Sequence, residues 1–426
     1  MTKKSDAPAI RFKGFSDAWE QRKLGDIGET YTGLSGKTKA DFGHGQARFV
    51  TYMNVFSNPI SNPEMTEPIE IDPKQNEVEV GDVFFTTSSE TPEEVGMSSV
   101  LLEKRGKTYL NSFCFGFRPS EKIDSYYLAY MLRSESAREK IILLAQGISR
   151  YNISKNKVME IAVSLPSLDE QKLIGQYFRQ LDNLITLHQR KFEKLTNVKK
   201  SMLEKMFPQN GSSYPEIRFK GFTDPWEQRK FDEVFDCTVP NNTLSRAELS
   251  YDEGTVLNVH YGDVLIKYGS VLDVQKDDIP RIPHRCREDF NGALLQDGDV
   301  IIADTAEDET TGKACEIGNL QGSAIVSGLH TMVCRPRNRM ALGYLGYYLN
   351  SNAYHHQLLP LMQGIKVLSL SRSNIQKTSV SYPIAVKEQQ LIAYYFSQLD
   401  NLITLHQREL EKLQNIKKSM LEKMFV

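Results

Sequence analysis

FRQLDNLITLHQRKFEKLTNVKKSMLEKMF, residues 178–207, returns at residues 396–425 as FSQLDNLITLHQRELEKLQNIKKSMLEKMF, and this repeated stretch decides the fold. Twenty-five of the 30 positions are identical. Both copies lack Gly and Pro, are rich in strong helix formers, and carry apolar residues every three or four positions. Each copy is therefore predicted to form one long helix.

The apolar positions of each copy form a heptad seam, which predicts that each helix packs against a partner. The seam positions are Phe178, Leu181, Ile185, His188, Phe192, Leu195 and Met202 in the first copy, and Phe396, Leu399, Ile403, His406, Leu410, Leu413 and Met420 in the second. Lys199 and Lys417 also fall on the seam. We interpret His188 and His406 as polar residues that set the register rather than as metal ligands. The nearest candidate partner of each helix is the other copy.

Other words of the sequence repeat as well. IRFKGFSDAWEQRK at residues 10–23 returns as IRFKGFTDPWEQRK at residues 217–230, and each contains one of the two tryptophans, Trp19 and Trp226. The tryptophans are expected to anchor a core. Asp17 and Asp224 are typical of helix N-caps, and Pro225 fits a first helical position, so a helix is expected here. Four shorter pairs are Gly81-Asp82-Val83 with Gly298-Asp299-Val300, Phe117-Arg118-Pro119 with Cys334-Arg335-Pro336, Tyr127-Leu128-Ala129-Tyr130 with Tyr344-Leu345-Gly346-Tyr347, and Gln146-Gly147-Ile148 with Gln363-Gly364-Ile365.

Between these shared words lies a block that differs between the halves. Residues 31–79 and 238–296 contain short β-prone runs punctuated by Gly, Asn and Pro, and they look little alike. Differences that gather in one region, inside a shared frame, suggest two binding sites for two different targets.

We predict a mixed α/β (α+β) protein in which two pseudo-symmetric domains are separated by an antiparallel pair of long helices with the chain ends together. The predicted boundaries are 1–166, 167–208, 209–216, 217–383 and 384–426, for domain, helix, linker, domain and helix. Ser167 and Glu170 form the pattern of a capping box at the start of the first helix. A second apolar stripe, at Tyr177, Leu184, Leu187 and Val198, is either a domain-packing surface or a site for partner subunits.

Composition limits the partners and the compartment. The chain has 426 residues and a formal net charge of −2, so a nucleic-acid surface would have to be a local basic patch. Its five cysteines form no C-x-x-C pair, and an odd number argues against a disulfide framework. No signal-peptide pattern or membrane-length apolar run is present in the sequence. We therefore expect a soluble cytoplasmic protein that does not contact a membrane.

Motifs that could carry catalysis are incomplete. Gly36-Lys37-Thr38 imitates the end of a P-loop, but Tyr31 stands where the earlier Gly is required. The acidic cluster at Asp304 and residues 307–309 has no matching pattern in the other half, and we interpret it as a solvated turn. His330 and the pair His355-His356 lack partners at metal-ligand spacing. The chain is predicted to be non-catalytic, with no metal and no cofactor of its own.

Basic residues gather near the dissimilar blocks, which is typical of phosphate positioning with polar side chains left to read base edges. Together with two polar neighbours, the candidate DNA-binding residues are Lys37, Thr38, Lys39, Arg105, Lys107, Arg150, Tyr151, Arg281, Arg285, Arg287, Lys313 and Lys366.

Nearly the whole chain resembles the specificity subunit of type I restriction–modification enzymes. The resemblance rests on the paired IRFKGF-x-D-x-WEQRK openings, the paired QLDNLITLHQR and KKSMLEKMF helices, the Gly-Asp-Val strand starts, and LPSLDEQ at residues 165–171. It implies two target-recognition domains that each read half of a bipartite sequence in double-stranded DNA, and a helical rod whose length fixes the gap. It also implies two methyltransferase subunits that carry S-adenosylmethionine, and restriction subunits that use ATP and Mg²⁺. Recognition domains of this family differ widely, so the resemblance implies no individual base contact and no target sequence.

Two other classes of function remain open from the sequence. A pseudo-symmetric protein adaptor would bind two proteins through its divergent blocks, and its binding would not depend steeply on salt as DNA binding does. A stand-alone DNA enzyme would methylate or cleave DNA by itself, which the missing motifs disfavour.

Overall fold

The computed structural model describes residues 7–426 and confirms a mixed α/β fold with two similar units and two long helices. Unit 1 comprises the described residues up to Gln189 together with Gln407–Val426, and unit 2 comprises Arg190–His406. Each long helix therefore contributes one part to each unit. Within the described residues, no helix has both the length and the apolar character of a membrane span.

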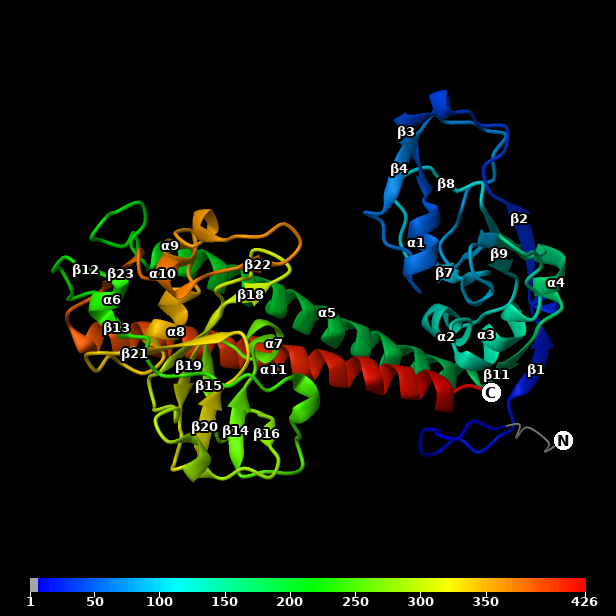
Figure 1. Ribbon diagram of the computed structural model, residues 1–426. Coiled ribbons are helices and arrows are strands. Elements are labelled where there is room, and N and C mark those ends of the chain that lie inside the picture. The colour runs from blue at the N-terminus through cyan, green and yellow to red at the C-terminus, as the bar shows by residue number, and fades with distance from the viewer. Residues whose placement is uncertain (1–6) are drawn as a thin grey trace. The chain divides into compact units, whose positions relative to one another are not determined.

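Unit 1 contains two small sheets and two short ladders (Figure 1). Its strands are β1 (Glu20–Lys23), β2 (Gly28–Thr32), β3 (Phe42–Val50), β4 (Thr66–Ile69), β5 (Val83–Thr86), β6 (Ser88–Ser89), β7 (Ser98–Val100), β8 (Thr108–Leu110), β9 (Cys114–Pro119), β10 (Tyr151–Asn152) and β11 (Ala162–Leu165). Its short helices are α1 (Tyr52–Ser57), α2 (Ser125–Met131), α3 (Glu135–Ile142) and α4 (Lys155–Met159). The sheets have the orders β2-β9-β5-β7 and β4-β3-β8, and β1 pairs with β11 and β6 with β10.

Unit 2 repeats this plan with one further strand, β15, at the edge of its larger sheet. Its strands are β12 (Glu227–Lys230), β13 (Phe235–Asp236), β14 (Val256–Val259), β15 (Val271–Asp273), β16 (Arg281–Ile282), β17 (Val300–Ala303), β18 (Thr305–Ala306), β19 (Ala314–Gly318), β20 (Ala324–Ser327), β21 (Thr331–Pro336), β22 (Leu368–Ser369) and β23 (Ser379–Tyr382). Its short helices are α6 (Phe231–Val234), α7 (Tyr261–Ile266), α8 (Tyr344–Leu349), α9 (Asn352–His355) and α10 (Arg372–Ile375). The sheets have the orders β13-β21-β17-β19-β15 and β16-β14-β20, and β12 pairs with β23 and β18 with β22.

The dissimilar sequence blocks share one topology, which a later strand of each unit completes, β8 in unit 1 and β20 in unit 2. In unit 1, β3 pairs antiparallel with β4 and parallel with β8, and α1 follows it directly. In unit 2, β14 pairs antiparallel with β16 and parallel with β20, and α7 follows it. The two blocks therefore use the same scaffold with different side chains, a relation that their sequences do not reveal.

The repeated openings form strands, so the expected helix after Asp17 or Asp224 is wrong. Residues 20–23 pair with β11, where Glu20 lies opposite Leu165, and residues 227–230 pair with β23 in the same way. This ladder joins the opening to the strand that leads into each long helix, and its cross-strand bonds outweigh the local capping signal. The expectation for Trp19 and Trp226 is confirmed, because both are buried in the core of their unit.

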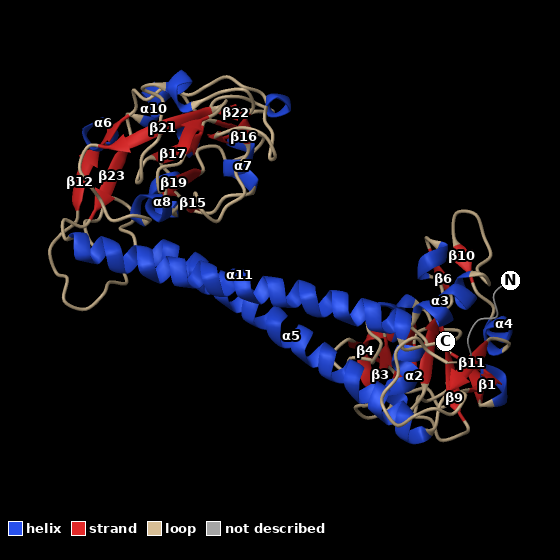
Figure 2. Ribbon diagram, turned by 90° about the horizontal axis from the view of Figure 1, so that it is seen from below, coloured by secondary structure: helices blue, strands red, loops and turns tan. Residues whose placement is uncertain are grey.

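The two long helices are α5 (Leu168–Lys205) and α11 (Val386–Lys423), with 38 residues each (Figure 2). The Ser167 Oγ accepts a hydrogen bond from the Glu170 backbone N–H at 3.4 Å, as a capping box requires. The second half of the predicted box is wrong, since the Glu170 carboxylate is held by both Nε and Nη2 of Arg11 at 2.7 and 2.8 Å. Arg218 holds Glu388 at the start of α11 with the same geometry.

The helices pack in opposite directions within each unit, as predicted. In unit 1, the start of α5 packs with the end of α11, and Phe178 stacks on Phe425 with ring centroids 5.6 Å apart. In unit 2, the end of α5 packs with the start of α11, and Phe207 stacks on Phe396 at 5.9 Å. The backbone N–H of Ile10 also donates to Lys423 at the end of α11, so the opening of the chain meets its C-terminal helix.

Candidate nucleic-acid interface

Two of the repeated sequence words form a pair that holds the frame of each unit. Asp82 of the Gly-Asp-Val word is buried, and Arg118 of the Phe-Arg-Pro word binds both of its oxygens at 2.8 Å. In unit 2, Arg335 binds Asp299 at 2.8 and 2.7 Å. A bidentate pair with a buried carboxylate fixes the strand β5 or β17 against β9 or β21. These words are therefore structural.

The short helix of each dissimilar block lies against the central strands of this frame, α1 against β5 and β7, and α7 against β17. The Thr51 side chain caps α1, and the Tyr52 hydroxyl donates to the Ser88 carbonyl of β6 at 2.7 Å. In unit 2, His260 caps α7, and Tyr261 packs edge-on against His330 with ring centroids 5.3 Å apart. Helices α1 and α7 thus each begin with a tyrosine, Tyr52 or Tyr261, but the two tyrosines contact different neighbours.

The structure separates the predicted basic residues of unit 1 into paired and unpaired ones. Lys37 binds Asp72 at 2.7 Å, and this bond helps to hold the pKa of the Asp72 carboxyl well below its usual range. Arg105 pairs with Glu64 at 2.6 Å, and Lys107 lies 3.9 Å from Glu77. Thr38 caps the 3-10 turn Lys39–Asp41, and Tyr151 lies half-buried on β10. Within the described residues, Lys39 and Arg150 remain exposed without an ion pair.

Unit 2 keeps more of its predicted cations free. Arg281, Arg285 and Arg287 are exposed within one short segment, and among the described residues none of them pairs with a carboxylate. Arg281 and Arg287 instead donate to the backbone carbonyls of Gly254 and Gly322. Lys366 is also exposed, and it forms no ion pair with any of the described residues. Lys313 is half-buried and donates to the Leu265 carbonyl at 2.9 Å, and burial lowers its pKa.

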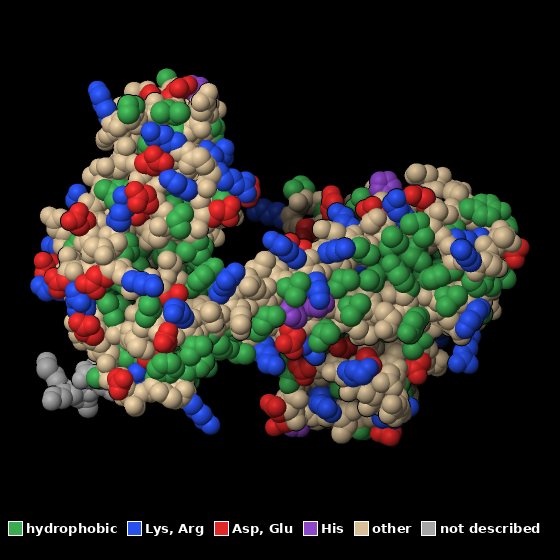
Figure 3. All heavy atoms as spheres, turned by 180° about the vertical axis from the view of Figure 1, so that it is seen from behind, with side chains coloured by type: hydrophobic (Ala, Val, Ile, Leu, Met, Phe, Trp, Pro, Cys, Tyr) green, Lys and Arg blue, Asp and Glu red, His purple; other side chains and the backbone are tan. Residues whose placement is uncertain are grey.

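Exposed charges of both signs are interspersed on the face drawn in Figure 3, in keeping with the small net charge. A polyanion would therefore be held by local groups such as the segment 281–287 rather than by a field over the whole protein. Among the described residues, no three His, Cys, Asp or Glu side chains are placed to hold a metal ion. In the acidic cluster, Asp304 lies 3.3 Å from Nδ1 of His330, and burial raises its pKa.

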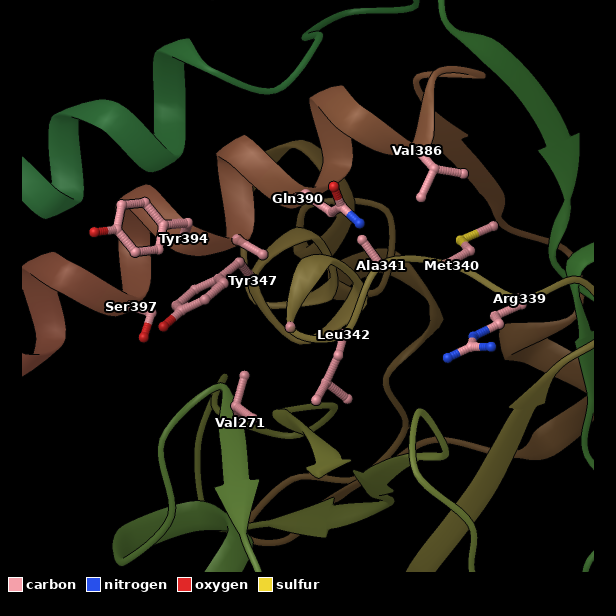
Figure 4. A pocket seen from close by; sticks show the side chains of 12 residues that line it. Val271, Arg339, Met340, Ala341, Leu342, Tyr347, Val386, Gln390, Tyr394 and Ser397 are labelled. Carbon is pink, nitrogen blue, oxygen red and sulfur yellow. The ribbon is translucent and has the colours of Figure 1, made fainter. Parts of the chain in front are cut away.

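A cavity of about 750 Å³ opens in unit 2 between the start of α8 and α11 (Figure 4). Its lining is largely apolar, including Leu342, Tyr347 and Tyr394, with Arg339 at one side. In unit 1, the equivalent turn carries Tyr126, whose ring stacks under Arg179 at 4.8 Å. None of the predicted DNA-binding residues lines the cavity.

The seam of the long helices contains a charged pair that sequence reasoning missed. Lys417 binds Asp182 at 2.5 Å, and the Tyr130 hydroxyl binds the other oxygen of Asp182 at 2.7 Å. In unit 2, Lys199 binds Asp400 at 2.5 Å, and Tyr347 does so at 2.9 Å. The signal was present in the sequence, because each of these residues lies inside a word that repeats. Each lysine that interrupts the seam thus joins both helices to a short helix of its unit.

Part of the second apolar stripe packs against the units, and part of it is exposed. Tyr177 and Val198 pack against the cores of units 1 and 2. Leu184 and Leu187 remain 44% and 46% exposed, and so do their counterparts Leu402 and Leu405, at 43% and 51%. Each long helix thus carries a half-exposed leucine pair, Leu184 with Leu187 on α5 and Leu402 with Leu405 on α11, and these two pairs are called the exposed leucine stripe.

The chain is similar to known proteins in sequence and in fold. Residues 16–197 and 223–415 match the family described as the type I restriction modification DNA specificity domain. The chain is 24% identical over 333 residues to the type I restriction enzyme MjaVIII specificity subunit of Methanocaldococcus jannaschii, covering 76% of this chain and 74% of that one. It is similar in structure to the type I restriction-modification S subunit from M. genitalium, with a TM-score of 0.58, 13% identity and 99% of both chains covered. It is also similar to a chain from a study of complex assembly and conformational transition of the type I R-M system, with a TM-score of 0.51, 15% identity, and 95% and 96% covered.

Proposed function

The chain belongs to the type I restriction modification DNA specificity family, and on that premise we propose that each of its units reads one half of a split target in double-stranded DNA. As a specificity subunit it is a non-catalytic part of the type I system. We assign recognition to residues 1–166, of which the first six lie outside the described part, and to residues 217–383. Residues 167–208 and 384–426 form the helical pair, with 209–216 as a linker.

The observation that carries this proposal is one scaffold used twice with different side chains. In each unit the small sheet built on the dissimilar block has the same strand order, β4-β3-β8 in unit 1 and β16-β14-β20 in unit 2. A reader of two different half-sites needs one docking geometry and two sets of base contacts, which is what such an arrangement supplies. Unpaired cations in both units, such as Arg150 and Arg285, support phosphate contacts. Lys37 and Lys313 support it less, because their side chains already have partners within the protein.

We propose that the helical pair fixes the gap between the half-sites. Helix α5 continues for 38 residues without a break, from unit 1 into unit 2. At 1.5 Å per residue it is roughly 57 Å long, which exceeds one turn of duplex DNA, about 34 Å. A continuous helix without proline curves only gently and has no sharp kink, so its length restricts the distance between two readers.

We further propose that the exposed leucine stripe, Leu184 with Leu187 and Leu402 with Leu405, binds two methyltransferase subunits. The two halves of the stripe repeat the same residues, so two copies of one partner fit better than two different partners. Adenine methylation with S-adenosylmethionine would occur on those subunits, and restriction subunits with ATP and Mg²⁺ would join them. We place this complex in the cytoplasm.

Modified-base sequencing of host DNA, with and without this gene, tests the proposal. We expect a gene-dependent methyladenine motif with two short halves around a fixed gap, provided that the methyltransferase partner is expressed. Replacing residues 31–160 by another recognition block should then change one half and leave the other. A change in both halves would contradict independent reading by the two units.

The alternative function, a protein adaptor, predicts a different result when the assembled complex is mixed with duplex DNA. Binding of the assembled complex to duplex DNA should weaken steeply as salt rises, because phosphate contacts release counterions. Binding to proteins alone, with little dependence on salt and no methylation motif, would support the adaptor instead.

A further inference from the structure

A loop of shared sequence presents a bare isoleucine to solvent in each unit. Ile148 of Gln146-Gly147-Ile148 is 95% exposed, and Ile365 of Gln363-Gly364-Ile365 is 100% exposed. No other large hydrophobic side chain in the described part of the chain is as exposed as these two. Such exposure does nothing for folding, because an apolar side chain contributes to stability only when it leaves water.

Backbone hydrogen bonds close each of these loops, residues 146–152 and 363–369, and attach it to the frame. Gln146 and Asn152 exchange two backbone hydrogen bonds of 3.0 and 2.8 Å, and Gln363 and Ser369 do the same at 3.0 and 2.8 Å. The residue after each loop, Ile153 or Leu370, bonds back to the frame at Thr87 or Asp304. Each isoleucine therefore lies in a short loop whose two ends are held together by backbone hydrogen bonds.

Each turn also requires its glycine. Gly147 and Gly364 have φ of +144° and +128°, and a Cβ there would lie 2.0 and 1.9 Å from the carbonyl oxygens of Arg150 and Val367. The glycine thus builds a turn that holds the next residue away from the core. Both units retain this arrangement although the neighbouring blocks differ, which indicates a task that both units share.

A cation stands beside each isoleucine. Arg150 and Lys366 are exposed, and neither pairs with a carboxylate among the described residues. An apolar tip with an adjacent free cation suits duplex DNA, where apolar wedges enter a groove and cations neutralise phosphates. Resting on the proposed function, we propose that both loops make a sequence-independent contact to duplex DNA, with the isoleucine in a groove and the cation at a phosphate.

Acidic residues near the loops restrict how the duplex can approach. Strand β6, which pairs with β10, leads into Glu90, Glu93 and Glu94, and strand β18, which pairs with β22, leads into residues 307–309 (EDE). Carboxylates repel phosphates, so the duplex meets the tip and not the acidic turn. Neutralising this turn should therefore tighten DNA binding, whereas it should weaken the docking of a basic protein.

The test measures binding of the assembled complex, purified through this chain, to a labelled duplex of random sequence. Ile148→Ser and Ile365→Ser should each weaken binding about tenfold, which corresponds to one buried isoleucine. Arg150→Gln and Lys366→Gln should each lower the salt slope by about one. The methylated motif should keep its sequence in all four variants. Ile384→Ser removes an exposed isoleucine outside the loops and should change nothing.

Glu90→Gln with Glu93→Gln is the deciding variant. Tighter duplex binding supports the proposal. Unchanged duplex binding by the isoleucine variants overturns it, and so does loss of a co-purifying subunit from those variants, which would assign the loops to a protein partner. The wild-type complex could bind duplex and methylate a split motif while the loop variants bind duplex as well as wild type does. That result would refute the loop contact alone. Wild-type complex that binds no duplex would refute the proposed function itself.

Discussion

Individual residues of the shared frame act in pairs drawn from distant repeated words. Arg11 of the opening holds Glu170 at the start of α5, and Asp82 holds Arg118. The sequence showed which words repeat, but no local pattern shows that an arginine in one word meets a carboxylate 159 positions away. For the same reason, the sequence could not separate Lys37, which binds Asp72, from Arg150, which is free. Residue types and regions were predictable, whereas their partners depend on the tertiary fold.

The Arg11–Glu170 pair gives a stability prediction for unit 1. Glu170 is fully buried, so Arg11→Met would leave a buried carboxylate without its partner and lower the free energy of unfolding by about 3 kcal/mol. Arg11→Met with Glu170→Gln should recover part of that loss. Fluorescence of Trp19 during urea unfolding reports unit 1 in a Trp226→Phe background, since the chain has two tryptophans. Arg22→Met, which breaks a partly exposed pair with Glu121, is the control and should lower the free energy of unfolding much less than Arg11→Met does.

Glu316 predicts a pH dependence of unit 2. Burial raises the pKa of its carboxyl to about 7, from an ordinary value of 4.5, although it accepts a hydrogen bond from the Gly346 N–H at 2.9 Å. The folded protein therefore favours the protonated form. The stability that this retained proton contributes to the folded state is fully present below pH 4.5 and is lost as the pH rises through about 7. Glu316→Gln keeps an acceptor but cannot ionise, so it should be more stable than wild type at about pH 8, by up to ~3 kcal/mol.

Trp226 fluorescence in a Trp19→Phe background measures this effect. Unfolding in urea at about pH 5 and about pH 8 gives the two free energies for wild type and variant. The difference between the two proteins should be small at the lower pH and large at the higher one. Equal differences at both pH values would show that Glu316 does not titrate in this range.

At the scale of elements, period and repetition made the long helices predictable. Thirty-eight residues without Gly in α11, and with one Gly in α5, leave few alternatives to a helix, and the seam implied a partner helix. The short strand at each opening was not predictable, because EQRK has no β pattern and becomes a strand only by pairing with β11 or β23. The common strand order of the dissimilar blocks was hidden for a similar reason: buried positions fix the topology, and many side chains can fill them.

The seam lysines predict an energetic coupling between α5 and α11 in unit 1. Lys417 and Asp182 are each about a quarter exposed on their side chains, so their bond is only partly screened by water. A double-mutant cycle with Lys417→Met and Asp182→Asn should give a coupling of about 1 kcal/mol in urea unfolding followed by Trp19. Lys199→Met with Asp400→Asn should give a similar value in unit 2, followed by Trp226. Additive effects in both units would mean that the charged pair does not fix the helix register.

At the scale of the molecule, the proposed ruler predicts that target spacing follows helix length. One heptad added to α5 after Gln189 and one added to α11 after His406 preserve the seam, because the apolar pattern repeats every seven residues. Both insertions lie where the helix passes from one unit to the other. Seven residues add about 10.5 Å, which is about three base pairs of duplex at 3.4 Å each. The methylated motif should keep both half-sites and gain a gap about three base pairs longer, as read by modified-base sequencing. A heptad added to α5 alone leaves the two helices with unequal seams and should lower stability rather than define a new gap. If the doubly lengthened protein stayed folded and methylated the original spacing, the helices would not be the ruler, and the separation of the half-sites would have to be set by the partner subunits.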